Sequence, residues 1–239
     1  MSLPRARFVV SSLPAAGERA LLSGEESAHA RARRLAPGDP VTLLDGSGRL
    51  ARAVLTRLDA KGAEVAVEEV VEAAVEEPRI ELLVAGLRAE RLAWIAEKAT
   101  ELGVAAMSIV ETARTQSFRA SSNVPERLER VAREAAKQSE SPRWPLFSGP
   151  LDFAEALVSG APRRFVLDAS GAPFPSELPA GPVALLVGPE GGWTSEELGS
   201  AVAGGWTAAS IPAGKLRAET AAIAAVVLVR AALARGRRD

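Results

Sequence analysis

The sequence contains no cysteine among its 239 residues, which excludes disulfides, thiolate nucleophiles and metal or iron–sulfur sites built on cysteine. Its one histidine, His29, cannot by itself form a histidine-rich metal site. A Ser-His-Asp hydrolase would need that histidine, and the chain has no G-x-S-x-G elbow. We therefore expect neither a catalytic metal nor a hydrolase of the triad type.

Long apolar runs are also missing. The longest, Ala221–Val229, is too short to span a bilayer and is followed by Arg230. The N-terminal stretch MSLPRARFVV lacks the apolar region and the cleavage site of a secretory signal. We expect a cytoplasmic protein with no membrane partner.

The formal net charge of −1 gives no overall indication of a nucleic-acid partner, but the charge is unevenly distributed. Arg31, Arg33 and Arg34 stand together in HARARRL, either as a solvated helix face or as phosphate contacts. Trp144, next to Arg143 in SPRWP, is either a packing residue or a platform for an unpaired RNA base.

The composition, with 47% apolar and 25% charged residues, is that of a globular protein. Residues 1–75 contain short alternating segments, a hairpin signal at Asp45–Gly48 and a short helical segment, ESAHARARRL. From residue 76 onward, apolar strand patterns alternate with helical patterns, which predicts a parallel sheet covered by helices. We expect an α/β protein with one domain over 1–75 and a second over 76–239.

A glycine-rich loop, Gly188-Pro189-Glu190-Gly191-Gly192, follows the apolar strand pattern PVALLV. In open α/β sheets, ligands bind beyond the carboxyl ends of strands, where glycine lets main-chain groups approach them. The alternative is a tight strand-to-helix turn. The chain has neither the Walker nor the dinucleotide glycine spacing, so ATP and NAD are poor candidates.

A second polar turn, LRAETA, covers Leu216–Ala221 and opens an alanine-rich helix pattern. Arg217 offers five donors, Glu219 a carboxylate and Thr220 a hydroxyl. These side chains either serve the free N–H groups of a helix start or face a polar ligand. Two such turns in one C-terminal third favour a shared pocket.

Together, LLVGPEGGW, LRAETA, EKATELGV (Glu97–Val104) and AAKQS (Ala135–Ser139) resemble the ribosomal RNA small subunit methyltransferase E family. Members of this family belong to the SPOUT superfamily and methylate N3 of a uridine in 16S rRNA. HARARRLAPGD and LLDGSG resemble the family's PUA-like RNA-binding domain. The resemblance covers nearly the whole chain.

The resemblance implies a SPOUT-type parallel sheet with a C-terminal trefoil knot, preceded by a small PUA-like β-barrel domain. It implies a homodimer, S-adenosylmethionine (SAM) bound within about residues 183–230, and 16S rRNA of the small ribosomal subunit as partner. The cofactor-binding residues that it implies are Leu186, Val187, Gly188, Pro189, Glu190, Gly191, Gly192, Ile211, Pro212, Leu216, Arg217, Glu219, Thr220 and Ala221. The candidate RNA-binding residues are His29, Arg31, Arg33, Arg34, Arg143 and Trp144.

The resemblance also implies the chemistry. Methyl transfer from a sulfonium is an in-line displacement that needs no metal and no covalent enzyme intermediate, in agreement with a chain without cysteine. We expect Arg217 to stabilise negative charge on the uracil oxygens, and Glu219 or Glu190 to receive the N3 proton. The alternative is that both glutamates hold loops by accepting backbone N–H bonds.

The chain departs from the family pattern at several positions. Pro212 stands for a glycine, Gly214 and Ser141 for arginines, Lys215 for an apolar residue and Ala93 for an acid. These departures keep two alternatives open: a non-catalytic RNA-binding or ribosome-assembly factor on the same fold, and a SPOUT methyltransferase with a different RNA target.

Overall fold

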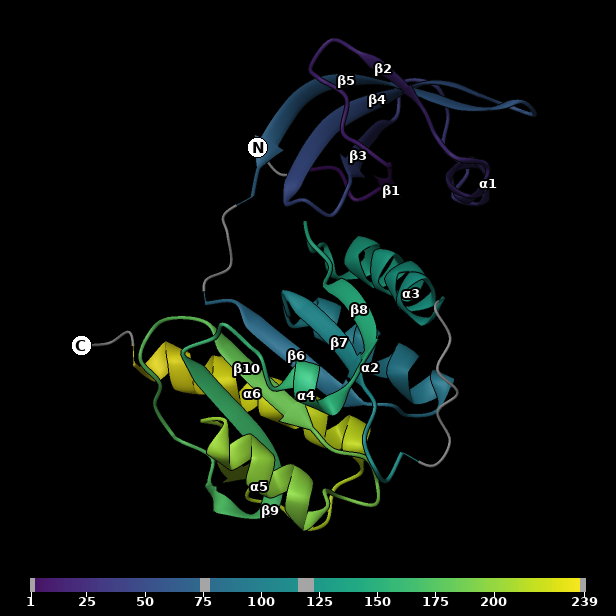
Figure 1. The fold of residues 1–239 in the computed structure, drawn as a ribbon. Coiled ribbons are helices and arrows are strands. Elements are labelled where there is room, and N and C mark those ends of the chain that lie inside the picture. Colours follow the sequence, from purple (N-terminus) through teal and green to yellow (C-terminus); the bar gives the residue numbers. More distant parts are fainter. Residues whose placement is uncertain (1–2, 74–77, 116–122, 237–239) are drawn as a thin grey trace. The chain divides into compact units, whose positions relative to one another are not determined.

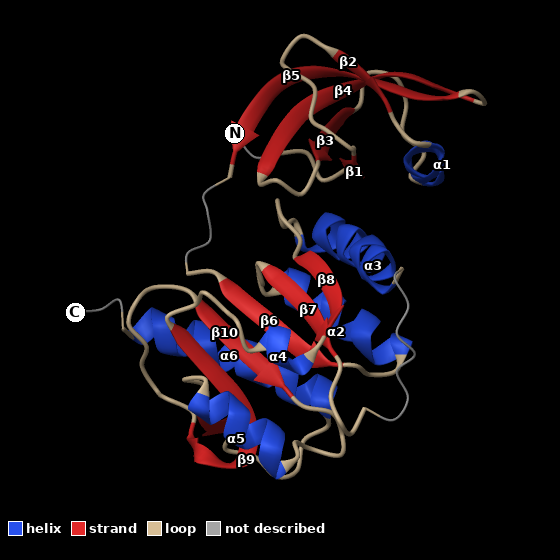
Figure 2. Ribbon diagram, viewed as in Figure 1, coloured by secondary structure: helices blue, strands red, loops and turns tan. Residues whose placement is uncertain are grey.

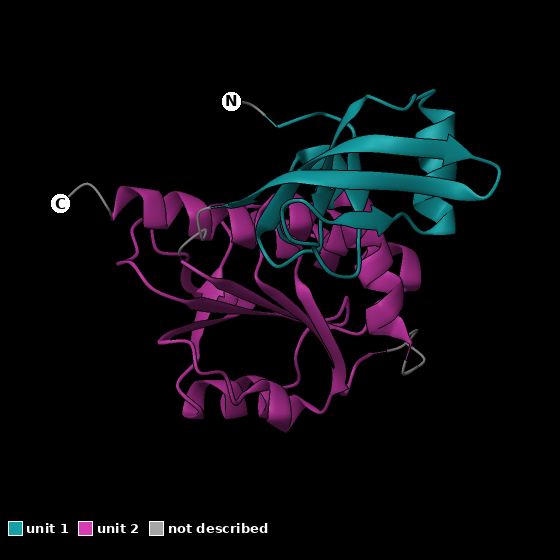
Figure 3. Cartoon of the chain, turned by 90° about the horizontal axis from the view of Figure 1, so that it is seen from above, with its two compact units in different colours: residues 1–75, 136–143 teal, residues 76–135, 144–239 magenta. Residues whose placement is uncertain are grey.

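The structure, a computed structural model, describes residues 3–73, 78–115 and 123–236. The chain divides into two compact units, drawn in two colours in Figure 3. The first comprises residues 1–75 and 136–143, and the second comprises residues 76–135 and 144–239. The division expected from the sequence did not place segment 136–143 with the N-terminal unit.

The first unit is built on one sheet of five strands. The strands, in spatial order, are β1 (Arg7–Val9), β3 (Pro40–Leu44), β4 (Arg49–Asp59), β5 (Gly62–Glu72) and β2 (Arg19–Leu21), and the helix is α1 (Gly24–Ala32). Neighbouring strands in this sheet are antiparallel, except for the pair at one edge, β1 and β3, which is parallel. The hairpin expected at Asp45–Gly48 is confirmed, since β3 and β4 pair antiparallel across it. The short helix expected in ESAHARARRL is confirmed as α1.

The second unit contains a sheet of six strands in which every neighbouring pair is parallel, as the alternating sequence pattern predicts. In spatial order they are β11 (Thr207–Ser210), β9 (Arg163–Pro173), β10 (Val183–Val187), β6 (Ile80–Ala85), β7 (Ala106–Val110) and β8 (Leu146–Leu151). Figure 2 shows these strands at the centre of the unit with helices around them. In this order β9 and β10 are neighbours, so residues of the two strands lie side by side.

Helices cover both faces of this sheet (Figure 1). The helices are α2 (Ala89–Glu101), α3 (Val124–Ser139), α4 (Phe153–Ala156), α5 (Ser195–Ala203) and α6 (Ala218–Arg235). One face of the sheet packs against α2 and α6, and the other packs against α4 and α5. None of the described helices combines the length and the apolar composition that crossing a bilayer requires.

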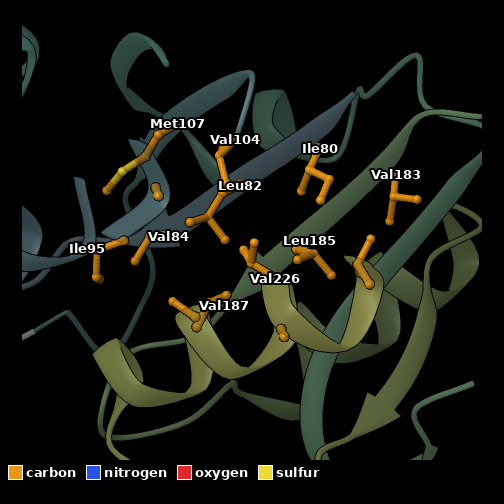
Figure 4. Close-up of a cluster of buried hydrophobic side chains, with 14 of the residues drawn as sticks. Ile80, Leu82, Val84, Ile95, Val104, Met107, Val183, Leu185, Val187 and Val226 are labelled. Atoms are coloured by element: carbon orange, nitrogen blue, oxygen red, sulfur yellow. The ribbon is translucent and has the colours of Figure 1, made fainter. Parts of the chain in front are cut away.

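The core of the second unit lies between the sheet and α6. Figure 4 shows Leu82, Leu185 and Val187 of the sheet facing Val226 of the helix. Since alternate residues of a strand point to opposite faces, Leu186 faces the other core, with Leu83, Val166 and Trp193. Strand β10 is therefore buried along its whole length, which explains its unbroken apolar sequence.

Local signals set the element ends. Gly103, at φ 67°, follows the last turn of α2. The N-cap of α5 is Thr194, in a reciprocal capping box with Glu197. Strand β8 was not expected, because Pro150 lies within it; β8 is an edge strand, where a missing backbone donor costs little.

Candidate functional site

A cavity of about 240 Å³ opens in the second unit at the carboxyl end of β10 and beside the middle of β9. The register pairs Leu167 of β9 with Val187, the last residue of β10, and β9 continues to Pro173. The cavity is lined by Leu167, Asp168, Ala169, Val187, Gly188, Pro189, Glu190, Gly192, Trp193, Ala209, Ile211, Ala213, Gly214, Lys215, Leu216, Ala218 and Ala221. The glycine loop and the turn before α6 therefore share one pocket, as the sequence predicts.

The glycine loop is shaped by Trp193. This side chain is buried, and its indole N–H donates to the main-chain oxygen of Leu167 at 2.9 Å. A Cβ at Gly188 would lie 2.9 Å from the indole ring, closer than side chains tolerate. Gly192 has φ +68°, in the left-handed region that favours glycine. The GPEGG sequence is thus required by the close approach of the indole ring and by backbone geometry.

A segment between β7 and α3 holds the same loop from outside. The Arg114 guanidinium donates to the main-chain oxygens of Gly191 and Trp193, at 2.9 and 3.0 Å. The backbone N–H of Ala113 donates to Glu197 at 2.8 Å. Sequence reasoning missed this contact, because its partners are separated by 77 or more positions along the chain.

The second turn leads from β11 into α6. Ile211 and Leu216 turn toward the cavity, and Arg217 is the N-cap residue of the helix. The Arg217 side chain is exposed and forms no hydrogen bond or ion pair with any residue that the structure describes. Its five donors therefore remain available to a ligand.

A second cavity adjoins the first and shares Lys215 and Leu216 with it. Its lining consists of Glu90, Arg91, Trp94, Lys215, Leu216, Arg217, Glu219 and Thr220. Within it the Arg91 guanidinium pairs with Glu190 and lies 3.7 Å from a Glu219 carboxylate oxygen. The polar side chains of LRAETA thus face this second cavity.

The two cavities divide the cofactor-binding residues that the resemblance implies. Val187, Gly188, Pro189, Glu190, Gly192, Ile211, Leu216 and Ala221 line the first cavity. Arg217, Glu219 and Thr220 line the second, whereas Leu186 is fully buried, and Gly191 and Pro212 line neither.

Sequence reasoning missed Leu167, Asp168 and Ala169 in the middle of β9. Leu167 pairs with the last residue of β10, so this part of β9 would have been a candidate once β9 was known to adjoin β10. Asp168 brings a carboxylate to the cavity wall, and Ser170 donates to it through both its backbone N–H and its hydroxyl. In the described part of the chain, no three His, Cys, Asp or Glu side chains are grouped to hold a metal ion.

The RNA-binding residues expected in α1 differ in surroundings. His29 is half-buried, packs edge-on against Phe8 at 5.7 Å, and lies 3.4 Å from the Lys137 ammonium. Arg31 donates to the main-chain oxygen of Asp59. Arg33 and Arg34 are exposed. Packing explains the position of His29, whereas the last two arginines project into solvent.

Arg143 and Trp144 follow α3. The Arg143 guanidinium occupies the space that a Cβ at Gly48 would need, and it donates to the main-chain oxygen of Ala73. The Arg133 guanidinium lies over the Trp144 ring, 5.8 Å from its centroid. Both residues therefore have structural partners in the absence of RNA.

Comparison with known proteins connects this geometry to a family. The RNA methyltransferase domain family matches residues 75–230, and the RNA methyltransferase PUA domain family matches residues 22–68. Ribosomal RNA small subunit methyltransferase E of Synechocystis sp. is 34% identical over 213 residues, which cover 85% of this chain and 69% of that protein. The protein of the same name from Mycobacterium bovis is 31% identical over 238 residues, covering 92% and 88%.

Solved structures of methyltransferases superpose on this chain as well. A putative methyltransferase from Legionella pneumophila, in complex with SAM, superposes with a TM-score of 0.87 at 26% identity, covering 96% of this chain and 98% of the other. A ribosomal RNA small subunit methyltransferase E from Neisseria gonorrhoeae, bound to S-adenosyl methionine, gives 0.85 at 25% identity, covering 95% and 98%. The resemblance drawn from the sequence motifs is confirmed: the chain belongs to the ribosomal RNA small subunit methyltransferase E family.

Proposed function

We propose that this chain transfers a methyl group from SAM to N3 of a uridine in 16S rRNA of the small ribosomal subunit. The observation that carries the proposal is the cavity at the end of β10 and beside β9, in which the glycine loop and the turn before α6 meet. Family membership supplies the reaction class. Two solved relatives that superpose on nearly the whole chain contain SAM.

The residues of this cavity fit SAM. Leu167, Val187 and Leu216 offer apolar walls for a flat purine, and the glycine loop offers main-chain groups at close range. A carboxylate at Asp168 suits the positive charge or the hydroxyls of such a ligand. We therefore assign the cofactor site to this cavity.

When bound, SAM supplies an electrophilic methyl group on a positively charged sulfur, which leaves as a neutral thioether. Arg217, exposed at the mouth of the second cavity, is placed to stabilise negative charge on the uracil oxygens. Glu219 or Glu190 receives the N3 proton, directly or through water.

Two of the five departures from the family pattern, Gly214 and Lys215, line the first cavity, and Lys215 also lines the second. Pro212 is exposed and lines neither cavity. We therefore expect these departures to affect the choice of RNA target more than the affinity for SAM.

We further propose a cytoplasmic homodimer with a functional division at residue 75. Trp94 on α2 and Val227 on α6 are 41% and 48% exposed, and these two helices pack together, which supports an apolar contact with a second copy. We also retain the trefoil knot. The path of the chain supports this proposal. After edge strand β11 the chain returns to the centre of the sheet, where α6 packs on β10 and β6.

The deciding experiment measures SAM binding by calorimetry and tritium transfer from labelled SAM to small subunits from a strain lacking the gene. One SAM per chain and transfer to 16S rRNA are expected. Mass spectrometry of the RNA then maps the modified nucleotide. Binding without transfer to any RNA would reject the enzymatic assignment and favour the assembly-factor alternative. Transfer to another RNA, or to another atom of the base, would reject the proposed target.

A further inference from the structure

Arg91, in the first turn of α2, contacts two carboxylates that lie far apart in the sequence. One of its terminal nitrogens pairs with Glu190 in the glycine loop, and its Nε lies 3.7 Å from Glu219 Oε1 at the start of α6. The three side chains are 28%, 51% and 15% exposed, respectively. One guanidinium therefore joins the loop after β10 to the helix after β11.

Of the two carboxylates, Glu219 depends more on its contact with Arg91. Its second oxygen, Oε2, is buried and has no hydrogen-bond partner among the described residues. A carboxylate removed from water is costly unless a cation compensates it, and the cation in contact with this one is Arg91. The orientation of Glu219 therefore rests on Arg91.

Arginine suits this task better than lysine. Its planar guanidinium presents several donors in a fixed arrangement and can hold two carboxylates together, whereas an ammonium is a compact point charge on a flexible stem. Arg217 is two residues before Glu219, at the N-cap of the same helix. A shift of Glu219 would consequently move the residue to which charge stabilisation is assigned.

We propose that Arg91 is a positioning residue for methyl transfer. By binding Glu190 and Glu219 at once, it keeps the cofactor loop and the start of α6 in the relative position that the reaction needs. The part that concerns transfer rests on the proposed function, and the part that concerns the ion pairs does not.

The test compares Arg91→Met, which keeps the length of the side chain but not its charge, with Arg91→Lys. In Arg91→Met we expect kcat to fall about 100-fold, the size associated with a misplacement of about 1 Å. The dissociation constant for SAM should rise less than about tenfold, since the loop keeps its contact with Arg114. Arg91→Lys, which can reach one carboxylate at a time, should restore part of kcat.

Double-mutant cycles separate positioning from a general effect on stability. Glu219→Gln should lower kcat by a smaller factor in the Arg91→Met background than in the parent, and Glu190→Gln should do the same for SAM affinity. Additive effects in both cycles would overturn the proposal. Lys98→Met is the matched control, because Lys98 also lies on α2 and pairs with Glu97 and Glu101, remote from both cavities; it should behave as the parent.

A second readout does not depend on activity. Backbone amide exchange in residues 188–194 and 216–221 should become faster in Arg91→Met and remain unchanged in Lys98→Met. Unchanged exchange in Arg91→Met would overturn the proposal even if the parent enzyme is active. If the parent transfers no methyl group to any RNA, the proposed function fails, and the exchange measurement still decides whether Arg91 joins the two segments.

Discussion

The guanidinium of Arg114 binds the main-chain oxygen of Gly191 at 2.9 Å, and the same nitrogen reaches the oxygen of Trp193 at 3.0 Å. A charged donor thus fixes the outer side of the glycine loop. Hydrogen bonds to charged groups contribute about 1.5–3 kcal/mol, so we expect Arg114→Met to weaken SAM binding at least about tenfold. Calorimetric titration with SAM measures this change.

The control for this prediction is Arg235→Met. Arg235 also donates to a main-chain oxygen, that of Ser176 at 3.1 Å, but from the far end of α6. Its replacement should leave SAM affinity unchanged. If both variants bind SAM as the parent does, Arg114 has no part in shaping the loop.

Gly188 offers a test of the close approach between the loop and Trp193. In Gly188→Ala, the new methyl group would meet an indole that is buried and hydrogen-bonded to Leu167, so the loop must shift. We expect SAM affinity to fall at least about tenfold, because main-chain groups of the loop line the cavity.

Gly199→Ala is the matched change. Gly199 lies on α5, and nothing stands within 4 Å of a Cβ built there. Alanine favours a helix over glycine by about 0.8–1 kcal/mol, so this variant should be as stable as the parent or more so, with unchanged SAM affinity. Equal SAM affinity in the two alanine variants would mean that the loop tolerates a side chain at Gly188.

Much of the fold follows from local patterns in the sequence. The apolar run of β10 predicts a strand, and the alternation of strand and helix patterns predicts that its sheet is parallel. Ser195 or Thr194, followed by Glu196 and Glu197, predicts the start of α5, and the structure uses Thr194. Strand β8 was missed, because Pro150 argues against a strand unless the strand is known to lie at an edge. Edge positions are a property of the sheet order, which no local pattern contains.

The candidate site, like the fold, was predictable where local sequence motifs mark it and not where it depends on packing between distant segments. The glycine loop and LRAETA stand out as separate sequence motifs, and residues of both line one cavity. The cavity residues of β9 were missed because the place of this strand beside β10 is set by packing. The contacts of Arg91 and Arg114 were missed for a similar reason: each joins segments 77 or more positions apart, and arginines on a helix or loop carry no local sign of such partners.

Arg217 is the side chain to which we assign charge stabilisation in the reaction. Removing one donor of this kind costs about 10²–10³ in kcat, so Arg217→Ala should lose at least this much transfer. SAM affinity should change little, because Arg217 faces the second cavity and does not line the first. Single-turnover transfer and calorimetry on the same preparation separate the two effects. Unchanged turnover would remove Arg217 from the mechanism.

The first unit contains a buried ion pair between Glu26 of α1 and Lys137, 2.9 Å apart and 6% and 8% exposed. Removing one partner leaves the other charge buried, which costs about 3–5 kcal/mol. We expect Lys137→Met to lower the free energy of unfolding by about this amount, measured by urea denaturation. The double variant Glu26→Leu, Lys137→Met should recover most of the loss. A double variant less stable than Lys137→Met would show that the pair is not the cause.

Arg33 and Arg34 are exposed near the end of α1, where Arg31 is already engaged by Asp59. If they contact phosphates, each contact contributes about 0.7–0.9 to the slope of log K against log salt concentration. We therefore expect charge reversal of both to weaken binding to 16S rRNA fragments and to flatten that slope. Arg19→Glu is the control, because it makes the same kind of charge change on exposed strand β2 of the same unit. Identical slopes for the double variant and the parent would return both arginines to an ordinary surface role.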